Sequence, residues 1–176
     1  MNSQTSTRVV PSATQHFVGA LSSLHRKAEN GHGPSRAILA RLRRTLTGRT
    51  LSFDGMREIG DILSAEIHES QLETYLLIAA LFAHNPSAVS SGSSLGGTLR
   101  SLRGQLSAGA ESLDRRFSAV LDAQAEELPY RLRQLNQLLK SKNVSPNYFR
   151  LLDDLLYWDH PSRFVQRRWA KEYWVG

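Results

Sequence analysis

Apolar side chains recur at helical spacing along most of the chain. Near the C-terminus, Val165, Trp169 and Tyr173 fall at i, i+4 and i+8, so they form one stripe of a helix. Similar stripes predict helices at 17–24, 38–46, 56–67, 95–106, 113–121, 128–139 and 148–156. Residues 72–82 are apolar almost all round, which predicts a central, buried helix. No segment has the pattern of a strand, and the sequence therefore predicts an all-α fold.

A change of composition divides the helical pattern into two halves. Residues 86–97 read PSAVSSGSSLGG, with five serines and three glycines, a composition typical of a flexible connector. We therefore expect two small antiparallel helical bundles, at 12–86 and 95–176, joined by a Ser/Gly-rich connector at 87–94. The polar residues 1–11 are expected to form a frayed leader.

The charge is distributed unevenly along the 176 residues, whose formal net charge is +6. Residues 1–49 carry eight Lys or Arg against one acid, 50–94 carry one against six, and 95–176 carry thirteen against nine. Basic ends around an acidic middle favour a polyanion as one partner and a protein as another. The chain has no cysteine, no apolar run that could span a bilayer and no secretory signal, so we expect a cytoplasmic protein with no membrane partner.

The residue types that could carry catalysis do not converge in the sequence. The six histidines include no pair at i, i+4 around a glutamate, and no cysteine could complete a zinc site, so surface and capping roles are expected. Asp153 and Asp154 are adjacent and point about 100° apart on a helix, which disfavours a shared metal ion. We expect Asp154 to pair with a local arginine and Asp159 to cap the last helix. The sequence indicates no enzyme, no metal site and no cofactor.

Arginine is the chemical feature that remains, with 18 Arg against 4 Lys. Guanidinium groups bind phosphates as forks, and many of these lie beside apolar stripes, where they could reach a nucleic-acid backbone while the helix stays packed. Arg116 and Arg168 lie closest to the apolar faces and are expected to be structural instead. Trp158 and Trp169 are expected in the core, whereas Trp174 is left open between packing and base stacking. The candidate nucleic-acid-binding residues are Arg36, Arg41, Arg43, Arg44, Arg115, Arg131, Arg133, Lys140, Lys142, Arg163, Arg167 and Lys171.

Several motifs, in order, resemble a known family. The C-terminal pattern is Tyr148-x-x-Leu151-Leu152-x-Asp154-Leu155-x-x-Trp158-Asp159, followed by Val165-Gln166-Arg167-Arg168-Trp169-Ala170. Upstream stand Leu42-Arg43-Arg44, Ser94-Leu95-Gly96, Arg115-Arg116-Phe117 and a leucine-rich run from Glu127 to Lys140. Together they resemble the CasB (Cse2) small subunit of type I-E CRISPR Cascade complexes, over most of residues 34–174.

This resemblance implies a helical, non-catalytic subunit of an RNA-guided complex in antiviral defence. Members of the family commonly occur as two copies and contact the backbone of bound nucleic acid. The partners it implies are guide RNA, target DNA with its displaced strand, other Cascade subunits and a second copy of this chain. Base pairing by the guide supplies sequence specificity in such assemblies, so the protein needs only to hold the backbone. Arg43, Arg44, Arg115, Arg131 and Arg133 match the family's basic positions.

Two alternatives from other classes remain open at this point. The first is a helical adaptor whose acidic middle and basic ends bind proteins only. The second is a helix-turn-helix regulator that reads duplex DNA with residues 35–46. The adaptor should not bind random single-stranded DNA, and the regulator should prefer one duplex sequence.

Overall fold

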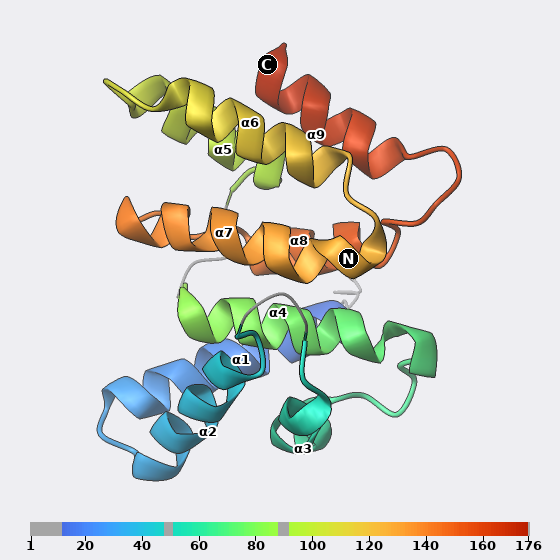
Figure 1. The fold of residues 1–176 in the computed structure, drawn as a ribbon. Coiled ribbons are helices and arrows are strands. Elements are labelled where there is room, and N and C mark those ends of the chain that lie inside the picture. Colours follow the sequence, from blue (N-terminus) through green and yellow to red (C-terminus); the bar gives the residue numbers. More distant parts are fainter. Residues whose placement is uncertain (1–11, 48–50, 88–91, 176) are drawn as a thin grey trace, which may run out of the picture.

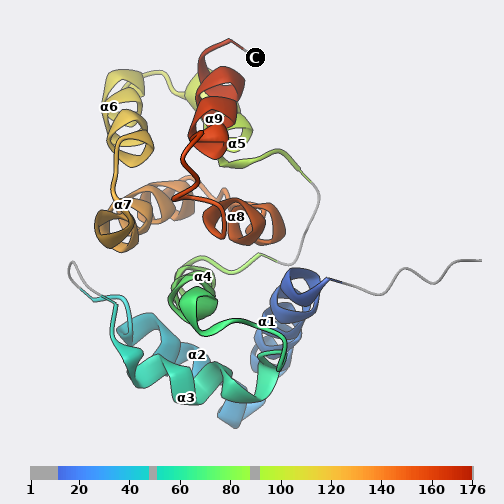
Figure 2. The ribbon, with the colours of Figure 1, turned by 90° about the vertical axis from the view of Figure 1, so that its right-hand side faces the viewer.

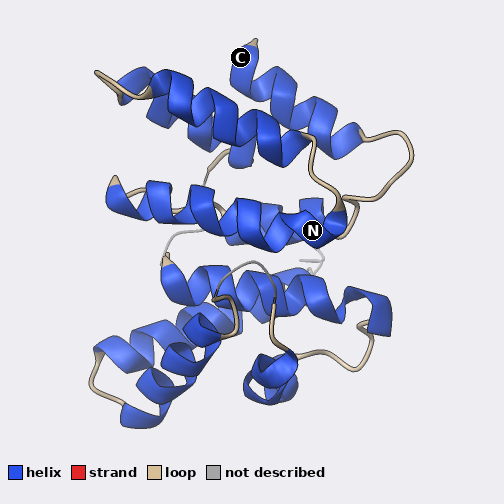
Figure 3. Ribbon diagram, in the orientation of Figure 1, coloured by secondary structure: helices blue, strands red, loops and turns tan. Residues whose placement is uncertain are grey.

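A computed structural model describes residues 12–47, 51–87 and 92–175 of the chain. Its regular elements are helical throughout these residues, which confirms the all-α prediction (Figure 3). The expected leader at 1–11 and positions 88–91 of the expected connector lie outside the described residues. None of the described helices is both long and apolar enough to cross a membrane.

Nine α-helices and four short 3₁₀ helices follow one another in the described residues. The α-helices are α1 (Ala13–Glu29), α2 (Gly33–Arg44), α3 (Met56–Ile59), α4 (Leu72–His84), α5 (Leu95–Gln105), α6 (Ala110–Leu121), α7 (Leu128–Ser141), α8 (Tyr148–Leu155) and α9 (Phe164–Trp174). The 3₁₀ helices are Phe53–Gly55, Gly60–Ile62, Glu69–Gln71 and Ala125–Glu127.

The helices are stacked in tiers (Figures 1 and 2). Helix α4 lies between α1, α2 and α3 on one side and α7 with α8 on the other, and it contacts α2, α7 and α8. Helices α5, α6 and α9 form the outer tier, in which α5 packs along α9 and α6 contacts both α9 and α7. Buried residues from both halves of the chain belong to one hydrophobic core. The division into two bundles therefore stays a prediction.

Helix α4 is the centre of this core. Every residue from Tyr75 to Ala83 is buried, as the uniformly apolar sequence predicts. The rings of Phe17 on α1 and Tyr75 pack edge-on with their centroids 4.9 Å apart, and those of Phe82 and Tyr148 on α8 pack edge-on with their centroids 5.2 Å apart. Aromatic contacts thus stabilise the packing of α4 against both neighbouring tiers.

Buried polar side chains join the end of α4 to α7 and α8. Asn136 donates to the Leu81 carbonyl oxygen (2.8 Å), and Asn85 donates to Asn136 (3.2 Å) and to the Val144 carbonyl oxygen (2.9 Å). The Tyr148 hydroxyl lies 2.8 Å from the Asn85 carbonyl oxygen, and burial raises the pKa of this phenol far above its usual range. Buried polar groups need such partners, so this network fixes where α4 ends against the other helices.

The structure differs from the sequence-based prediction in two places. The helix expected at 56–67 is an α-helix only over Met56–Ile59, extended by a 3₁₀ turn on each side, and the chain becomes extended at Leu63. Glycines at 55 and 60 weaken helical continuation there. Asp159 does not cap α9, because that helix begins at Phe164 after Arg163, whose left-handed backbone has φ +49°.

The prediction that Trp158 and Trp169 belong to the core is confirmed. Both side chains are buried, with ring centroids 5.3 Å apart. Their packing joins the end of α8 to α9.

Candidate nucleic-acid interface

Helix α2 carries four of the candidate cations on a well-capped amphipathic frame. Its first turn is capped by His32, whose Nδ1 accepts from the Ser35 amide at 3.3 Å, and Leu39 and Leu42 face the core. The first of the cations, Arg36, donates from Nε to the Ala28 carbonyl oxygen at 3.0 Å, which joins α2 to the end of α1. One donor of its guanidinium is therefore already used within the chain.

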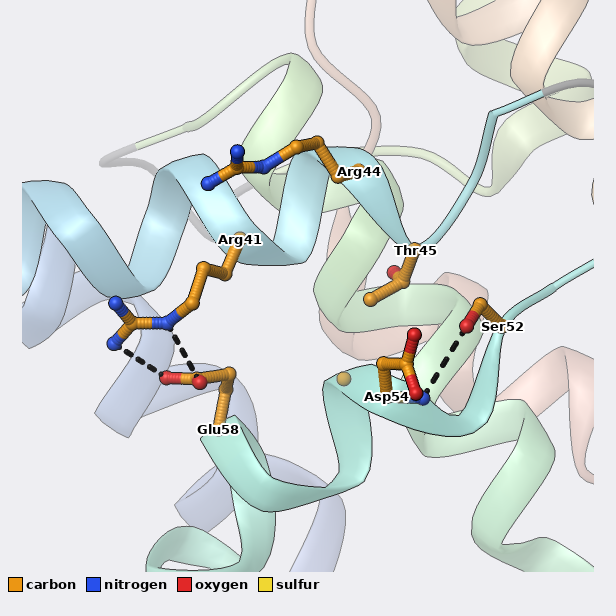
Figure 4. A pocket seen from close by; sticks show the side chains of 7 residues that line it. Arg41, Arg44, Thr45, Ser52, Asp54 and Glu58 are labelled. Carbon is orange, nitrogen blue, oxygen red and sulfur yellow. Dashed lines mark hydrogen bonds and ion pairs between the residues drawn. The ribbon is translucent and has the colours of Figure 1, made fainter.

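Arg41 is neutralised within the chain. Its Nε and Nη2 donate to the two carboxylate oxygens of Glu58, at 2.6 and 2.9 Å, in a bidentate pair at the edge of a pocket (Figure 4). The hydrogen bond with Glu58 raises the pKa of Arg41. Arg44 lines the same pocket and is exposed, and its side chain makes no hydrogen bond or ion pair to another described residue. Of these two candidates, Arg44 has the unopposed charge.

Three candidate cations gather around His84 at the end of α4. Nε2 of His84 donates to the Arg43 carbonyl oxygen at 2.9 Å, and Arg43 Nε donates to the Ala83 carbonyl oxygen at 2.7 Å. Burial lowers the pKa of His84, and the positive charges of Arg133, Lys140 and Arg43 lower it further, although the bond to the Arg43 carbonyl opposes them. We call Arg43, His84, Arg133 and Lys140 the basic cluster.

The basic cluster joins elements that are far apart in the sequence. Arg43 comes from the last turn of α2, His84 from the end of α4, and Arg133 and Lys140 from α7. Arg43 and Lys140 are exposed, so two cations of the cluster face solvent. Sequence reasoning missed His84, since only its place at the end of the buried helix hinted that it could lie beside the arginines.

The other candidates on α7 differ in how far their charge is available. Arg131 Nη2 lies 3.8 Å from Oε1 of Glu127, and its guanidinium carbon lies 5.9 Å from the ring centre of Tyr130. Lys142 is exposed beyond the last turn, where the negative end of the helix dipole favours a cation. Lys142 and Lys140 make no ion pair to a described residue, which leaves both charges unopposed.

Candidates on α6 and α9 lie in the outer tier. Arg163 donates to the Leu121 carbonyl oxygen at the end of α6, whereas Arg167 and Lys171 are exposed on α9 without a described partner. Arg115 is exposed on α6. The structure thus places these four cations in the outer tier, separate from the residues that make up the basic cluster.

The two arginines expected to be structural behave differently. Arg168 forms an ion pair with the buried Asp154, which also accepts from the Trp169 indole at 2.6 Å, as the expected local pairing of Asp154 requires. Arg116 is exposed and makes no hydrogen bond or ion pair within the described chain, so a structural role is wrong for it. The sequence placed Arg116 beside the apolar stripe, but Arg116 is exposed although its neighbour Phe117 is buried.

The outer tier also contains an arginine that the candidate set does not include. Arg103 pairs with Asp114 through two hydrogen bonds of 2.8 and 3.1 Å and holds the pKa of that carboxyl below its usual range. Its guanidinium lies 5.9 Å from the ring centre of Trp174, an exposed side chain. Both residues contribute to packing at the C-terminal end of α9.

The exposed cations of this arrangement can bind phosphates. No group of three or more metal-ligating side chains occurs among the residues that the structure describes. The unopposed cations Arg44, Lys140 and Lys142, together with Arg43, can form charge-assisted hydrogen bonds to a polyanion without reading its bases.

Comparison with known proteins places the chain among CRISPR-associated proteins. The family described as CRISPR-associated protein Cse2 matches residues 38–174. The CRISPR-associated protein Cse2 of Thermus thermophilus is 36% identical over 106 residues, which cover 60% of this chain. The aligned region spans 59% of that relative's own length.

Solved structures of similar proteins share the fold. CasB from Thermus thermophilus has a TM-score of 0.74 at 30% identity, covering 94% of this chain and 100% of that one. CasB from M. ruber has a TM-score of 0.67 at 31% identity, with 93% of each chain covered. A chain from a CRISPR RNA-guided surveillance complex has the same fold at 23% identity, with a TM-score of 0.66 and coverage of 89% of this chain and 90% of that one. The family match extends over more than three quarters of the sequence, and this chain therefore belongs to the Cse2 family of CRISPR-associated proteins.

Proposed function

We propose that this chain is a non-catalytic subunit of an RNA-guided CRISPR surveillance complex of the Cascade type, where it holds nucleic-acid backbone during antiviral defence. The strands it would hold are guide RNA, target DNA and the displaced strand. Other Cascade subunits and a second copy of the chain would be its protein partners, in the cytoplasm. Family membership and the solved relative from a surveillance complex support this assignment.

The observation that carries the proposal is the basic cluster. Arg43 and Lys140 stand on different helices beside a His84 whose own charge is suppressed. Two exposed cations from different helices can contact successive phosphates of one strand, and neutralising phosphates releases counterions. This mode of binding gives affinity without sequence preference, as expected where a guide supplies specificity.

Binding of the full-length protein to random single-stranded DNA and RNA, measured at several salt concentrations, tests the proposal. Arg43→Gln/Lys140→Gln should lower affinity evenly across sequences and reduce the slope of log affinity against log salt by roughly 1 to 2. Glutamine at position 43 retains an amide that can donate to the Ala83 carbonyl oxygen, which limits damage to the fold. Arg57→Gln/Arg150→Gln removes two exposed charges elsewhere and serves as the matched control.

Three outcomes would contradict the proposal. Equal losses in the two double variants would show that general charge, and not the basic cluster, drives binding. Preference for one duplex sequence would favour the helix-turn-helix regulator. Absence of binding by the unaltered protein, both alone and reconstituted with its partner subunits and guide RNA, would favour the adaptor.

A further inference from the structure

A groove opens at the end of α4 that lies away from the basic cluster. It has a volume of about 160 Å³ and lies between the start of α4, the start of α7 and the end of α8. Its apolar lining comes from Leu77, Leu128, Pro129, Leu155 and Trp158. These five residues come from three segments that are distant in the sequence, and Leu51 lines the groove from a fourth.

The charge of this groove is opposite to that of the basic cluster. Glu73 and Asp159 are exposed on its rim, and none of its described lining residues is Lys or Arg. Glu126, also exposed, precedes the α7 residues of the floor by two positions. Carboxylates in these positions repel phosphate, which argues against nucleic acid as the occupant.

The floor is preformed. The indole of Trp158 is 3% exposed, donates to the Ala123 carbonyl oxygen at 3.1 Å and packs on Trp169. Leu128 and Leu155 are each 5% exposed. A rigid apolar floor needs little reordering when a partner docks, and this lowers the cost of binding.

We propose that this groove docks a segment of a partner protein in which an aromatic or large aliphatic side chain is flanked by arginine or lysine. A cavity of roughly 150 Å³ accepts a benzene-sized group, so the groove can take one such side chain. The flanking cations would pair with Glu73 and Asp159 at the rim, where complementary charge selects the partner and fixes its orientation. A buried apolar anchor with a polar rim is the usual anatomy of a protein interface.

The groove and the basic cluster lie at opposite ends of one rigid helix. Thr74 lines the groove and His84 belongs to the cluster, and ten residues of α-helix separate them by about 15 Å. The chain could therefore hold a polyanion and a basic protein segment at the same time. The acidic stretch at 50–94 then has a partner of its own, and docking requires no nucleic-acid contact.

A short probe peptide tests the groove on the full-length protein. We would titrate an amidated arginine–phenylalanine–arginine peptide into the isotope-labelled chain and follow its amide and indole signals, with a glutamate–phenylalanine–glutamate peptide as the acidic twin. Shifts should be confined to the groove, around Thr74, Leu77 and Ala125. Glu73→Lys/Asp159→Lys should weaken binding by about tenfold, since two attractions become repulsions.

Asp61→Lys/Glu66→Lys changes the net charge by the same amount at exposed acids that do not line the groove, and it should leave the shifts intact. Shifts of equal size with the acidic twin, equal losses in both double variants, or no shifts in the groove would overturn the proposal. Arg43→Gln/Lys140→Gln should not affect peptide binding. Failure of nucleic-acid binding and failure of docking are thereby separated.

Cross-linking in the assembled complex identifies the occupant. The chain has no cysteine, so Thr74→Cys introduces a single thiol at the groove, and Ser101→Cys provides an exposed control on α5. After reconstitution with the partner subunits and guide RNA, Thr74→Cys should cross-link to a basic segment of another subunit. Cross-links from Thr74→Cys to nucleic acid or to a second copy of the chain would contradict the assignment. The absence of cross-links from both cysteine variants would contradict it as well.

Discussion

His84 on α4 and Arg43 on α2 each donate a side-chain hydrogen bond to a backbone carbonyl group of the other's helix. Nε2 of His84 donates to the Arg43 carbonyl oxygen, and the Arg43 side chain returns a bond to the carbonyl oxygen of Ala83, next to His84. The carbonyl groups at both helix ends would otherwise lack a partner within their own helix. The pair thus caps two helices and holds a guanidinium beside the cations of α7.

Replacing this histidine should change how stability depends on pH. Burial lowers the pKa of His84 in the folded chain, so acidification below the ordinary histidine pKa protonates the unfolded chain preferentially. The stabilising contribution is complete above that ordinary pKa and is lost as pH falls toward the folded-state pKa. His84→Gln removes the titration, and its urea midpoint should fall less than that of the unaltered chain between about pH 7.5 and about pH 5.5.

His16→Gln is the control for that experiment, since His16 is exposed near the start of α1. It should retain the full pH dependence. If the urea midpoint of His84→Gln fell with pH as steeply as that of the unaltered chain, the His84 imidazole would not contribute to the pH dependence of stability.

Releasing Arg41 from its carboxylate should strengthen nucleic-acid binding. Glu58→Gln removes the negative charge that faces Arg41 across the pocket, and a free guanidinium beside Arg44 adds a phosphate contact. We expect affinity for random single-stranded DNA to rise by roughly two- to tenfold, with the salt slope steeper by about one. Asp61→Asn removes an exposed charge that has no ion-pair partner among the described residues, and it should change affinity less. Equal gains in both variants would mean that only net charge matters.

Local pattern was enough to predict the periodic helices. Most apolar residues of the stripes in α1, α2 and α7 are buried, and Leu24, Ile38 and Leu138 are partly buried against the core. The all-round apolar sequence of α4 predicts its central place. The pattern failed at 56–67 because apolar spacing alone does not record the cost of glycines inside a helix. It also failed at Asp159, because the turn before α9 is longer than a cap at this position requires.

The site depends on long-range contacts that local pattern does not contain. Residues 43 and 140 come close enough to His84 to act on its charge only because α4 lies between α2 and α7, and neighbouring residues in the sequence do not specify that arrangement. Likewise, the pairing of Arg41 with Glu58 depends on how α3 folds back on α2 (Figure 4). The Asp154–Arg168 pair was foreseeable in kind, since a buried carboxylate needs a partner.

The crossing of α5 and α9 should tolerate no side chain at Gly96. A Cβ atom there would lie 2.4 Å from the Trp169 carbonyl oxygen and 2.9 Å from its Cα, both backbone atoms. Gly96→Ala should lower the free energy of unfolding by about 1–3 kcal/mol or more, because the helices must separate. Gly104→Ala, in the same helix with nothing within 4 Å of the added carbon, should be neutral or stabilising by up to about 1 kcal/mol. Urea denaturation of the two variants decides, and equal stabilities would show that the crossing is not tight.

The adjacent aspartates of α8 offer the sharpest separation of a structural carboxylate from a solvated one. Asp154 is buried and receives hydrogen bonds from Arg168 and the Trp169 indole, whereas Asp153 is exposed. Asp154→Asn leaves the guanidinium of Arg168 without its counter-charge, and because Arg168 is partly exposed, we expect a loss of about 1–3 kcal/mol in urea denaturation. Asp153→Asn should stay within about 0.5 kcal/mol of the unaltered chain. Neither change touches the basic cluster, so nucleic-acid affinity of the folded variants should be retained. If Asp154→Asn folded fully but bound nucleic acid more weakly, this carboxylate would instead support the binding surface by positioning Arg168 on α9.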